Sequence, residues 1–360
     1  MTAAAGKTAN RENRACSPSI SQIHAVSTRN FANERLHGCE GLDVAPVACY
    51  RSGVLIRKRL EELSALGVPL HLALGVFDGV HIGHQEVIRR AVNAAARDGG
   101  LAGMLTFDPH PIRVIAPDKA PTSLLATLDH KAAIVRDLGI GLFIPLHFDA
   151  AFAAMEASEF IKRLTTAPVR TIAVGEDWRF GHRRSGDVAF LESEGKLRHF
   201  TLDAVPPVML DGERVSSTRI RQAIRDGNLE AAQRMLGRPY SVCGVVVEGK
   251  KLGRTIGFPT ANIATGDAQL PPDGVWVVTT LLADGRNLGG VANLGMRPTV
   301  NGLARTLEVH LFNFSEEIYG QEVEIQFVKH LRGEIKFPSL DALCIQIQRD
   351  AEDAQEILKI

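Results

Sequence analysis

The fold is decided by the stretch LHLALGVFDGVHIGHQ, residues 70–85, in which an apolar run leads into a glycine-rich turn with two histidines. The apolar residues at its start predict a buried strand, and the sequence after the turn has helical spacing up to Gly99. Residues 101–107 form a second apolar run. A strand, a helix and a further strand in this order predict the first unit of an open parallel sheet.

The same alternation continues through the next part of the chain. Ser216 or Ser217 is the expected cap of a later helix, and Gly237 is expected to end the helix after it. This pattern predicts a doubly wound parallel sheet that binds ligands at the carboxyl ends of its strands. The expected elements are helices at 130–140, 151–164, 216–227 and 228–237, and strands at 141–148 and 171–175.

After Gly237 the sequence changes to β-branched or alternating runs separated by Gly, Asn and Asp turns. These runs predict an antiparallel sheet or small barrel, followed by a closing helix at 339–358. We therefore expect a disordered extension over residues 1–60, an α/β domain over 61–236 and a barrel domain over 237–360. The predicted strands lie at 240–249, 274–285, 287–295, 305–314 and 321–331.

Composition restricts the partners and the compartment. Forty-one Lys and Arg residues balance forty-one Asp and Glu residues, so no global field attracts nucleic acid or an anionic membrane. No run approaches the ~18 apolar residues of a membrane span. The five cysteines form no CxxC pair and are odd in number, which argues against a zinc cluster or a disulfide framework. We expect a cytoplasmic protein with small-molecule substrates that is a monomer or a weak homo-oligomer.

His81 and His84 lie in the turn between the first strand and the first helix, where open α/β sheets bind phosphates. Both imidazoles can face one phosphoryl group there, which suits nucleotidyl transfer because charge builds on the α-phosphate. Two other interpretations of the pair stay open: solvated or capping histidines, and a zinc site that includes Asp78. The chain has no GxxxxGK[ST] motif, which excludes a P-loop.

The segment GVFDGVHIGHQ, residues 75–85, resembles the HxGH signature of nucleotidyltransferases in the form typical of bacterial bifunctional riboflavin kinase/FAD synthetases. Three further segments similar to that family follow in order, each at a predicted strand end or helix start. The chain departs from the family at Val76, where Asn is common, and at Trp178, where Phe is usual. The three segments are TFDPHP at 106–111, VGEDWRFGHRRSGD at 174–187 and RVSSTRIR at 214–221.

This resemblance implies an FMN adenylyltransferase (FAD synthetase) site in the first domain. His81 and His84 are implied to contact the ATP phosphates and the transition state, and Asp108 and His110 to lie near the flavin. The residues implied to hold the pyrophosphate are Arg214, Ser217, Thr218 and Arg221. Arg221 also fits a solvated helix face. The implied ATP-binding residues are Phe77, Asp78, Gly79, Asp177, Arg214, Ser217, Thr218 and Arg221.

The segment GKKLGRTIGFPTANI, residues 249–263, is similar to the flavokinase module of the same family, as are GMRPTV, LEVHLFNF and LRGEIKF after it. Glu308 is implied as the catalytic base for the riboflavin hydroxyl. The residues alone favour a solvated strand glutamate, and strand periodicity does not decide between the two interpretations. Thr260 also fits a turn residue after Pro259, and Arg297 and Arg332 also fit ordinary ion pairs. Implied ligand contacts are Gly253, Gly257, Thr260 and Asn262 for ATP, Thr260 and Asn262 for Mg²⁺, and Arg297 and Arg332 for flavin.

The resemblance implies a bifunctional enzyme in which riboflavin and ATP give FMN, and FMN and ATP give FAD and pyrophosphate, both with Mg²⁺. One alternative is an HxGH transferase for another phosphomonoester, such as phosphopantetheine. A second is a flavokinase with a degenerate first half. A third is a flavin-sensing or flavin-binding module without catalysis.

Overall fold

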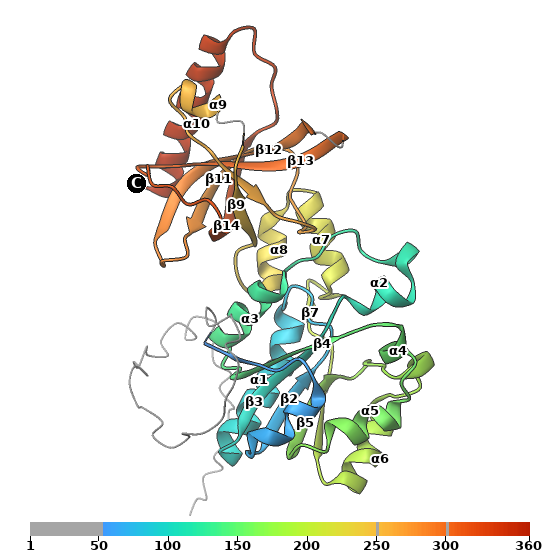
Figure 1. Ribbon diagram of the computed structural model, residues 1–360. Coiled ribbons are helices and arrows are strands. Elements are labelled where there is room, and N and C mark those ends of the chain that lie inside the picture. The colour runs from blue at the N-terminus through green and yellow to red at the C-terminus, as the bar shows by residue number, and fades with distance from the viewer. Residues whose placement is uncertain (1–52, 250–251, 300–301) are drawn as a thin grey trace, which may run out of the picture. The chain divides into compact units, whose positions relative to one another are not determined.

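Six parallel strands form one sheet in the order β1-β4-β3-β2-β5-β6 (Figure 1). The chain runs from β2 to β3 on one side and from β5 to β6 on the other, so the neighbours β2 and β5 flank a topological switch point. The predicted doubly wound sheet is confirmed, with β1 and β6 as additions. The strands are β1 Leu55–Ile56, β2 Leu70–Leu74, β3 Leu101–Asp108, β4 Leu142–His147, β5 Val169–Gly175 and β6 Thr201–Val205.

This computed structural model describes residues 53–249, 252–299 and 302–360. The segment expected to be disordered is residues 1–60, and its residues 1–52 lie outside the described residues. Its last part does not fit that expectation, because β1 pairs with β4 and Leu60 is buried against the sheet. Ordered structure therefore begins before residue 61.

Helices cover both faces of the sheet. α1 Ile82–Asp98 and α3 Leu128–Asp137 pack on one face, and α5 Ala157–Leu164 and α6 Val188–Arg198 pack on the other. Successive side chains of a strand point to opposite faces, and β2 follows this rule: Leu72 packs on the α5 side and Ala73 on the α1 side. Both faces are therefore apolar, as a buried parallel sheet requires.

The helix predicted at 151–164 is two helices, α4 Ala150–Ala153 and α5. Asp149 caps α4 by accepting a hydrogen bond from the Phe152 N–H (2.7 Å). The backbone then turns extended at Glu156, and the Met155 carbonyl accepts a hydrogen bond from the His182 N–H (2.8 Å). A distant segment takes a carbonyl that a continuous helix needs, so local periodicity could not show the break.

Two helices after the sheet confirm the expected caps. α7 Ser217–Arg225 is capped by Ser216, whose hydroxyl accepts from the Arg219 N–H (3.3 Å). α8 Leu229–Leu236 ends at Gly237, which has a φ of 70°. The unpredicted elements also include α2 Pro111–Ile115, β7 Met209–Leu210 and β8 Glu213–Arg214.

The remaining strands form a closed antiparallel barrel in the order β10-β13-β12-β11-β14-β9. The barrel is thus the correct choice between the two predicted arrangements, with β10 as an unpredicted strand and the closing helix confirmed. The elements are β9 Ser241–Val247, α9 Leu252–Thr255, β10 Ala261–Ala264, β11 Gly274–Leu281, β12 Asn287–Thr299, β13 Gly302–Leu311, β14 Glu322–Arg332 and α10 Leu340–Leu358.

The barrel core does not stop at Gly237. Trp276 and Leu307 of the barrel belong to the same buried cluster as Ile220 and Ile224 of α7 and Met235 of α8. The described residues form one compact unit, Cys49–Ile360. The boundary between 236 and 237 therefore stays a prediction, and it cuts a shared core.

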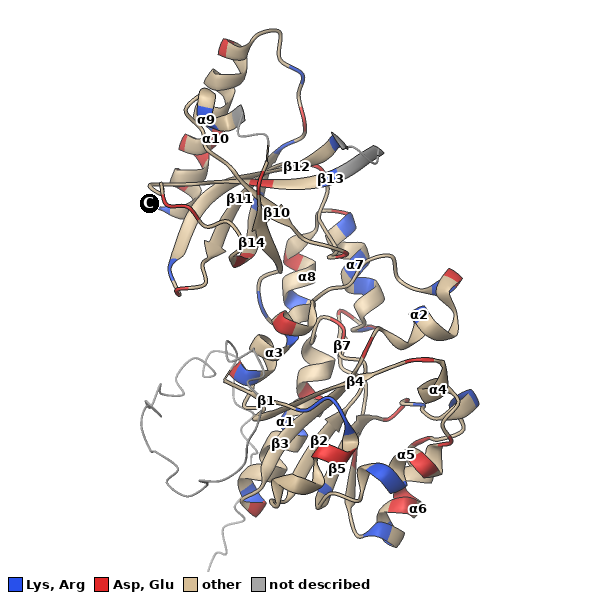
Figure 2. Cartoon of the chain, in the orientation of Figure 1, with Lys and Arg blue, Asp and Glu red and all other residues tan. Residues whose placement is uncertain are grey.

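Charge is spread evenly over the described chain. Acidic and basic residues are interspersed on the helices and loops around the sheet and on the barrel part of the chain (Figure 2). Within the described ranges, every helix is too short or too polar for a membrane crossing.

Candidate functional site

The turn after β2 has an unusual backbone. Phe77 and Val80 have φ values of 50° and 44°, which side-chain-bearing residues rarely adopt. Gly79 has a φ of 80°, and a Cβ there would lie 2.7 Å from Leu125 Cδ1, so only glycine fits. Such strain persists only where the surroundings hold the backbone in place, and it is concentrated at functional sites.

This turn brings His81 and His84 together. Their rings stack with centroids 3.6 Å apart, and Phe77 meets the His84 ring edge-on at 5.2 Å. His81 caps α1, and its Nδ1 accepts a hydrogen bond from the His84 N–H (3.3 Å). The Nδ1 of His84 is buried without a hydrogen-bond partner among the described residues. This nitrogen is therefore an unsatisfied polar atom within the turn.

Both imidazoles are neutral near pH 7. Burial, aided by the charge of Arg214, lowers the pKa of His81 to about 4. Burial also lowers the pKa of His84 well below its ordinary value, and the charges of His81 and Lys131 act in the same direction. A bound anion favours the charged imidazolium, so the pair can gain positive character as phosphate charge develops.

Asp78 and Arg221 form a buried ion pair between the turn and α7. The other carboxylate oxygen of Asp78 accepts from the Leu125 N–H (3.0 Å). The Nε of Arg221 donates to the Ser123 carbonyl (2.9 Å). Both charged groups are therefore already satisfied by the protein.

The N-terminus of α7 lies beside the same turn. Ser217 Oγ donates a hydrogen bond to the Asp78 carbonyl (2.9 Å). Thr218, the next residue, is exposed, so its hydroxyl can reach a ligand. A helix N-terminus carries positive potential and free N–H groups, which suits an anion such as pyrophosphate.

Asp177 and Arg214 also meet. Asp177 follows β5, Arg214 lies in β8, and Arg214 Nη1 donates to Asp177 Oδ2 at 2.5 Å. This hydrogen bond lowers the pKa of Asp177. Both side chains are more than half exposed, at 57% for Asp177 and 53% for Arg214. A bound molecule can therefore contact them without any movement of the surrounding protein.

The second family segment lies at the end of β3. Asp108 is exposed, and His110 caps α2 with its Nδ1 accepting from the Ile112 N–H (3.3 Å). Burial lowers the pKa of His110, against the negative charge of Asp78. Asp108 and His110 thus flank one strand end at the ligand-binding edge of the sheet.

The two departures from the family pattern have plain structural roles. Trp178 stacks on Phe180 with ring centroids 4.4 Å apart, which keeps an aromatic surface at this position. Val76 packs against the apolar cluster on the α5 side of the sheet, and its carbonyl accepts from Thr106 Oγ1 (2.8 Å).

Sequence reasoning missed two cations at this site. Arg238 donates to the carbonyls of Gly79 (2.9 Å) and Val80 (3.2 Å), and burial lowers its pKa to about 10. Lys131 is buried on α3, and burial lowers its pKa while the charges of Asp78 and Asp108 raise it. The available signal was a lysine on the otherwise apolar face of a predicted helix.

A second group of predicted residues gathers on the barrel. Glu308 pairs in antiparallel register with Asn262 of β10 on one side and Asn293 of β12 on the other. Directly opposed residues share a face of the sheet. Leu307 and Val309 are buried in the barrel core, so Glu308 and its two partners point outward. Asn293 is an addition to the predicted site.

The glycine-rich loop packs closely on this group. A Cβ on Gly249 would lie 2.1 Å from Asn262 Nδ2, and one on Gly253 would lie 2.2 Å from the Phe258 carbonyl oxygen. Gly257 has a φ of 85°. A pocket of about 320 Å³ opens beside Thr260, with Arg254, Phe314, Glu317 and Tyr319 also in its wall.

The two predicted flavin-binding arginines of the barrel have different surroundings. Arg297 lies 3.7 Å from Glu308 (Nε to Oε1) and donates to Glu334 (3.0 Å). Arg332 donates through Nε (3.0 Å) and Nη2 (2.7 Å) to Asp350, a buried residue of α10. Arg297 therefore borders the Glu308 face, whereas Arg332 is engaged with the closing helix.

Comparison with known proteins covers both parts of the chain. A family described as FAD synthetase matches residues 67–219, and a family described as riboflavin kinase matches residues 236–358. A solved structure titled macrolide-efflux protein from Streptococcus pneumoniae has a TM-score of 0.71 and 31% identity. The match covers 84% of this chain and 98% of that one.

Two curated relatives carry the same name, bifunctional riboflavin kinase/FMN adenylyltransferase. The Haemophilus influenzae protein is 41% identical over 286 residues, which cover 79% of this chain and 92% of the relative. The Escherichia coli K12 protein is 39% identical over 287 residues, which cover 79% of this chain and 91% of the relative. The chain therefore belongs to the bifunctional riboflavin kinase/FMN adenylyltransferase family.

Proposed function

We propose that this chain phosphorylates riboflavin on the outer face of the barrel and adenylylates FMN at the turn after β2. Family membership supports both transferase activities. The assignment of each step to particular residues is our proposal. ATP is the co-substrate in both reactions.

In the adenylylation step, a phosphate oxygen of FMN attacks the α-phosphorus of ATP, and pyrophosphate leaves. His81 and His84 hydrogen-bond the α-phosphate and become more positive as its charge grows. Asp108 and His110 lie on the flavin side. The support is the stacked pair and the unpartnered Nδ1 of His84.

The departing pyrophosphate is held by the N-terminus of α7. Ser217 and Thr218 supply hydroxyls there, and Arg214 supplies a guanidinium. Asp177 fixes Arg214 in the free enzyme and contacts the nucleotide when ATP is bound. The exposure of Arg214 and Asp177 supports this role.

Four residues implied as ligand contacts take positioning roles in this proposal. Asp78 and Arg221 satisfy each other's charge and hold α7 against the turn, so neither needs to touch ATP. Phe77 is buried, and it orients the His84 ring. Arg332 anchors α10 through Asp350 and does not bind flavin.

In the kinase step, Glu308 accepts the proton of the riboflavin hydroxyl that attacks the γ-phosphorus of ATP. Backbone N–H groups of the loop containing Gly253 and Gly257 hold the phosphates. Arg297, whose Nε lies 3.7 Å from Glu308 Oε1, orients the carboxylate. The outward direction of Glu308 and the neighbouring pocket support this role.

Thr260 and Asn262 fit a magnesium ion. They offer a hydroxyl and an amide oxygen, which are the hard ligands that Mg²⁺ prefers. A Cβ on Gly249 would overlap the Asn262 amide, so glycine at this position lets the loop lie directly against that side chain. When bound, the ion would neutralise charge on the ATP phosphates.

We place both reactions in the cytoplasm.

The observation that carries the proposal is the hydrogen bond from Ser217 to the Asp78 carbonyl, because it joins the fourth family segment to the first. The test is incubation of the full chain with riboflavin, ATP and Mg²⁺, followed by chromatographic separation of the flavins. We expect FMN and then FAD, with one pyrophosphate released per FAD.

The alternatives give different results in the same assay. FMN without FAD indicates a flavokinase alone. Flavin binding without turnover indicates a sensing module. Adenylylation of phosphopantetheine in preference to FMN indicates a different phosphomonoester substrate.

A further inference from the structure

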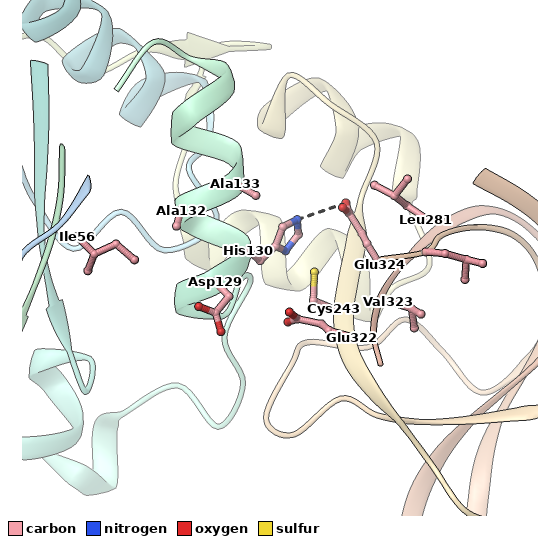
Figure 3. A pocket seen from close by; sticks show the side chains of 11 residues that line it. Ile56, Asp129, His130, Ala132, Ala133, Cys243, Leu281, Glu322, Val323 and Glu324 are labelled. Atoms are coloured by element: carbon pink, nitrogen blue, oxygen red, sulfur yellow. Dashed lines mark ion pairs between the residues drawn. The ribbon is translucent and has the colours of Figure 1, made fainter. Parts of the chain in front are cut away.

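A pocket outside both proposed catalytic sites combines nitrogen, sulfur and carboxylate groups. It has a volume of about 180 Å³ and lies between α3 and the outer surface of β9 and β14 (Figure 3). His130 and Asp129 line it from α3, Cys243 from β9, and Glu322 and Glu324 from β14. We call this the α3–barrel pocket.

The register of the barrel explains why two of these groups meet. Cys243 and Glu324 are directly opposed in the antiparallel pair of β9 and β14, so their side chains share a face. The next pair, Val242 and Ile325, lies in the barrel core. Cys243 and Glu324 therefore point away from the core and toward α3, as Figure 3 shows.

His130 completes the group from the other side. Its Nε2 lies 3.4 Å from Glu324 Oε1. One ligand atom each from His130, Cys243 and Glu324 lie within 4.8 Å of one another. His130 is only 4% exposed, and its Nδ1 is buried without a hydrogen-bond partner among the described residues. A small contraction brings the three atoms to the spacing of ligands around one ion.

The pocket is negatively charged. The Ser241 hydroxyl donates a hydrogen bond to the Glu324 carboxylate (2.6 Å). The carboxylates of Glu322 and Asp129 line the same pocket. Arg238 is the nearby cation that acts on Glu324. The excess of carboxylates favours a bound cation.

We propose that the α3–barrel pocket binds a divalent transition-metal ion, with Zn²⁺ as the best match, through His130 Nε2, Cys243 Sγ and a Glu324 oxygen. Imidazole, thiolate and carboxylate are the ligand types of zinc, whereas a sulfur ligand disfavours Mg²⁺ and Ca²⁺. Binding displaces the Cys243 thiol proton to solvent and shifts the proton of the neutral His130 ring from Nε2 to Nδ1. The fourth position is left to water. The ion would tie α3 to the barrel.

The test uses the full chain after chelator treatment, with Co²⁺ as a spectroscopic probe for Zn²⁺. A Co²⁺–thiolate bond gives a charge-transfer absorption band in the near ultraviolet. We expect this band in the unmodified chain, its loss in Cys243→Ser and its retention in Cys344→Ser, a matched control on α10. Zn²⁺ added in equal amount should remove the band by displacing Co²⁺.

Affinity measurements complete the test. Mutation of a residue that only hydrogen-bonds a metal ligand lowers metal affinity by about 10–100-fold. Glu324→Gln removes a ligand itself, so it should weaken Co²⁺ binding by at least about 100-fold. The metal-free melting temperature of each variant shows that it is folded. No band in the unmodified chain, or an equal band in folded Cys243→Ser, overturns the proposal. Because no flavin or ATP is used, the result is independent of the proposed catalytic roles.

Discussion

The guanidinium of Arg221 and the carboxylate of Asp78 form a buried ion pair that fastens α7 to the turn after β2. These residues are 143 positions apart in the chain. Each has its charge paired within the protein, and Ser217 of the same helix donates a hydrogen bond to the Asp78 carbonyl. The positioning role proposed for the pair leads to the first prediction.

Removing one partner of this pair should be costly. Arg221→Met leaves the Asp78 carboxylate buried and uncompensated, so we expect a loss of about 3–5 kcal/mol in the free energy of unfolding. The double variant Arg221→Met/Asp78→Asn should recover part of that loss, because the isolated charge is gone. Urea denaturation measures both. Arg219→Met on the same helix is the control; an equal loss there would show that the ion pair is not the cause.

The adenylylation site depends on His84. His84→Ala should slow FAD formation by about 10²–10³-fold, the scale for one lost electrostatic stabiliser, and leave FMN formation unchanged. Single-turnover assays with FMN and ATP measure the first effect, and assays with riboflavin measure the second. His182→Ala, in an exposed loop, should affect neither. Equal losses in both reactions would contradict the assignment.

Burial of His81 should make stability depend on pH. The unfolded chain binds a proton at this residue near pH 6.5 and the folded chain only near pH 4, so the unfolded state holds more protons between these values. Stability therefore falls as the pH falls through this window. Between about pH 7 and about pH 4.5, the wild type should lose roughly 2–3 kcal/mol more than His81→Gln. Parallel losses in urea titrations would show that His81 is not buried as a neutral group.

The kinase step depends on Glu308 as a base. Glu308→Gln keeps the shape of the side chain but cannot accept a proton, so FMN formation should fall by roughly 10²–10⁴-fold. The melting temperature and ATP affinity should stay near those of the wild type. Glu352→Gln, on the exposed side of α10, is the matched control. Near-normal turnover in a folded Glu308→Gln would make Glu308 an ordinary surface residue.

The shared core makes a prediction about fragments. A fragment of residues 237–360 contains the barrel and every proposed kinase residue, and we expect it to form FMN but no FAD. A fragment of residues 216–360 should be more stable by roughly 3 kcal/mol or more, because Ile220, Ile224 and Met235 are buried with the barrel residues. Urea denaturation of both fragments compares them. Equal stability would show that α7 and α8 do not complete the barrel core.

The sequence by itself determined the alternation of strands and helices and the positions of the four motif segments. Local patterns suffice for this: the apolar run of β2, the turn with His81 and His84, and the Ser216 cap are all encoded within a few residues. The resemblance of the segments to one family then identified the chemistry. The barrel strands other than β10 were equally visible, because Gly, Asn and Asp turns separate their alternating runs.

Only the tertiary structure decided which polar groups are already occupied. Arg221 and Arg332 look alike as candidate ligands in the sequence, but each meets a buried carboxylate from a distant segment. The same holds for the break between α4 and α5, where a carbonyl is taken by His182. The meeting of His130 with Cys243 and Glu324 was equally hidden. These features depend on pairings between residues at least 18 positions apart, and such pairings leave no periodic signal in a single sequence.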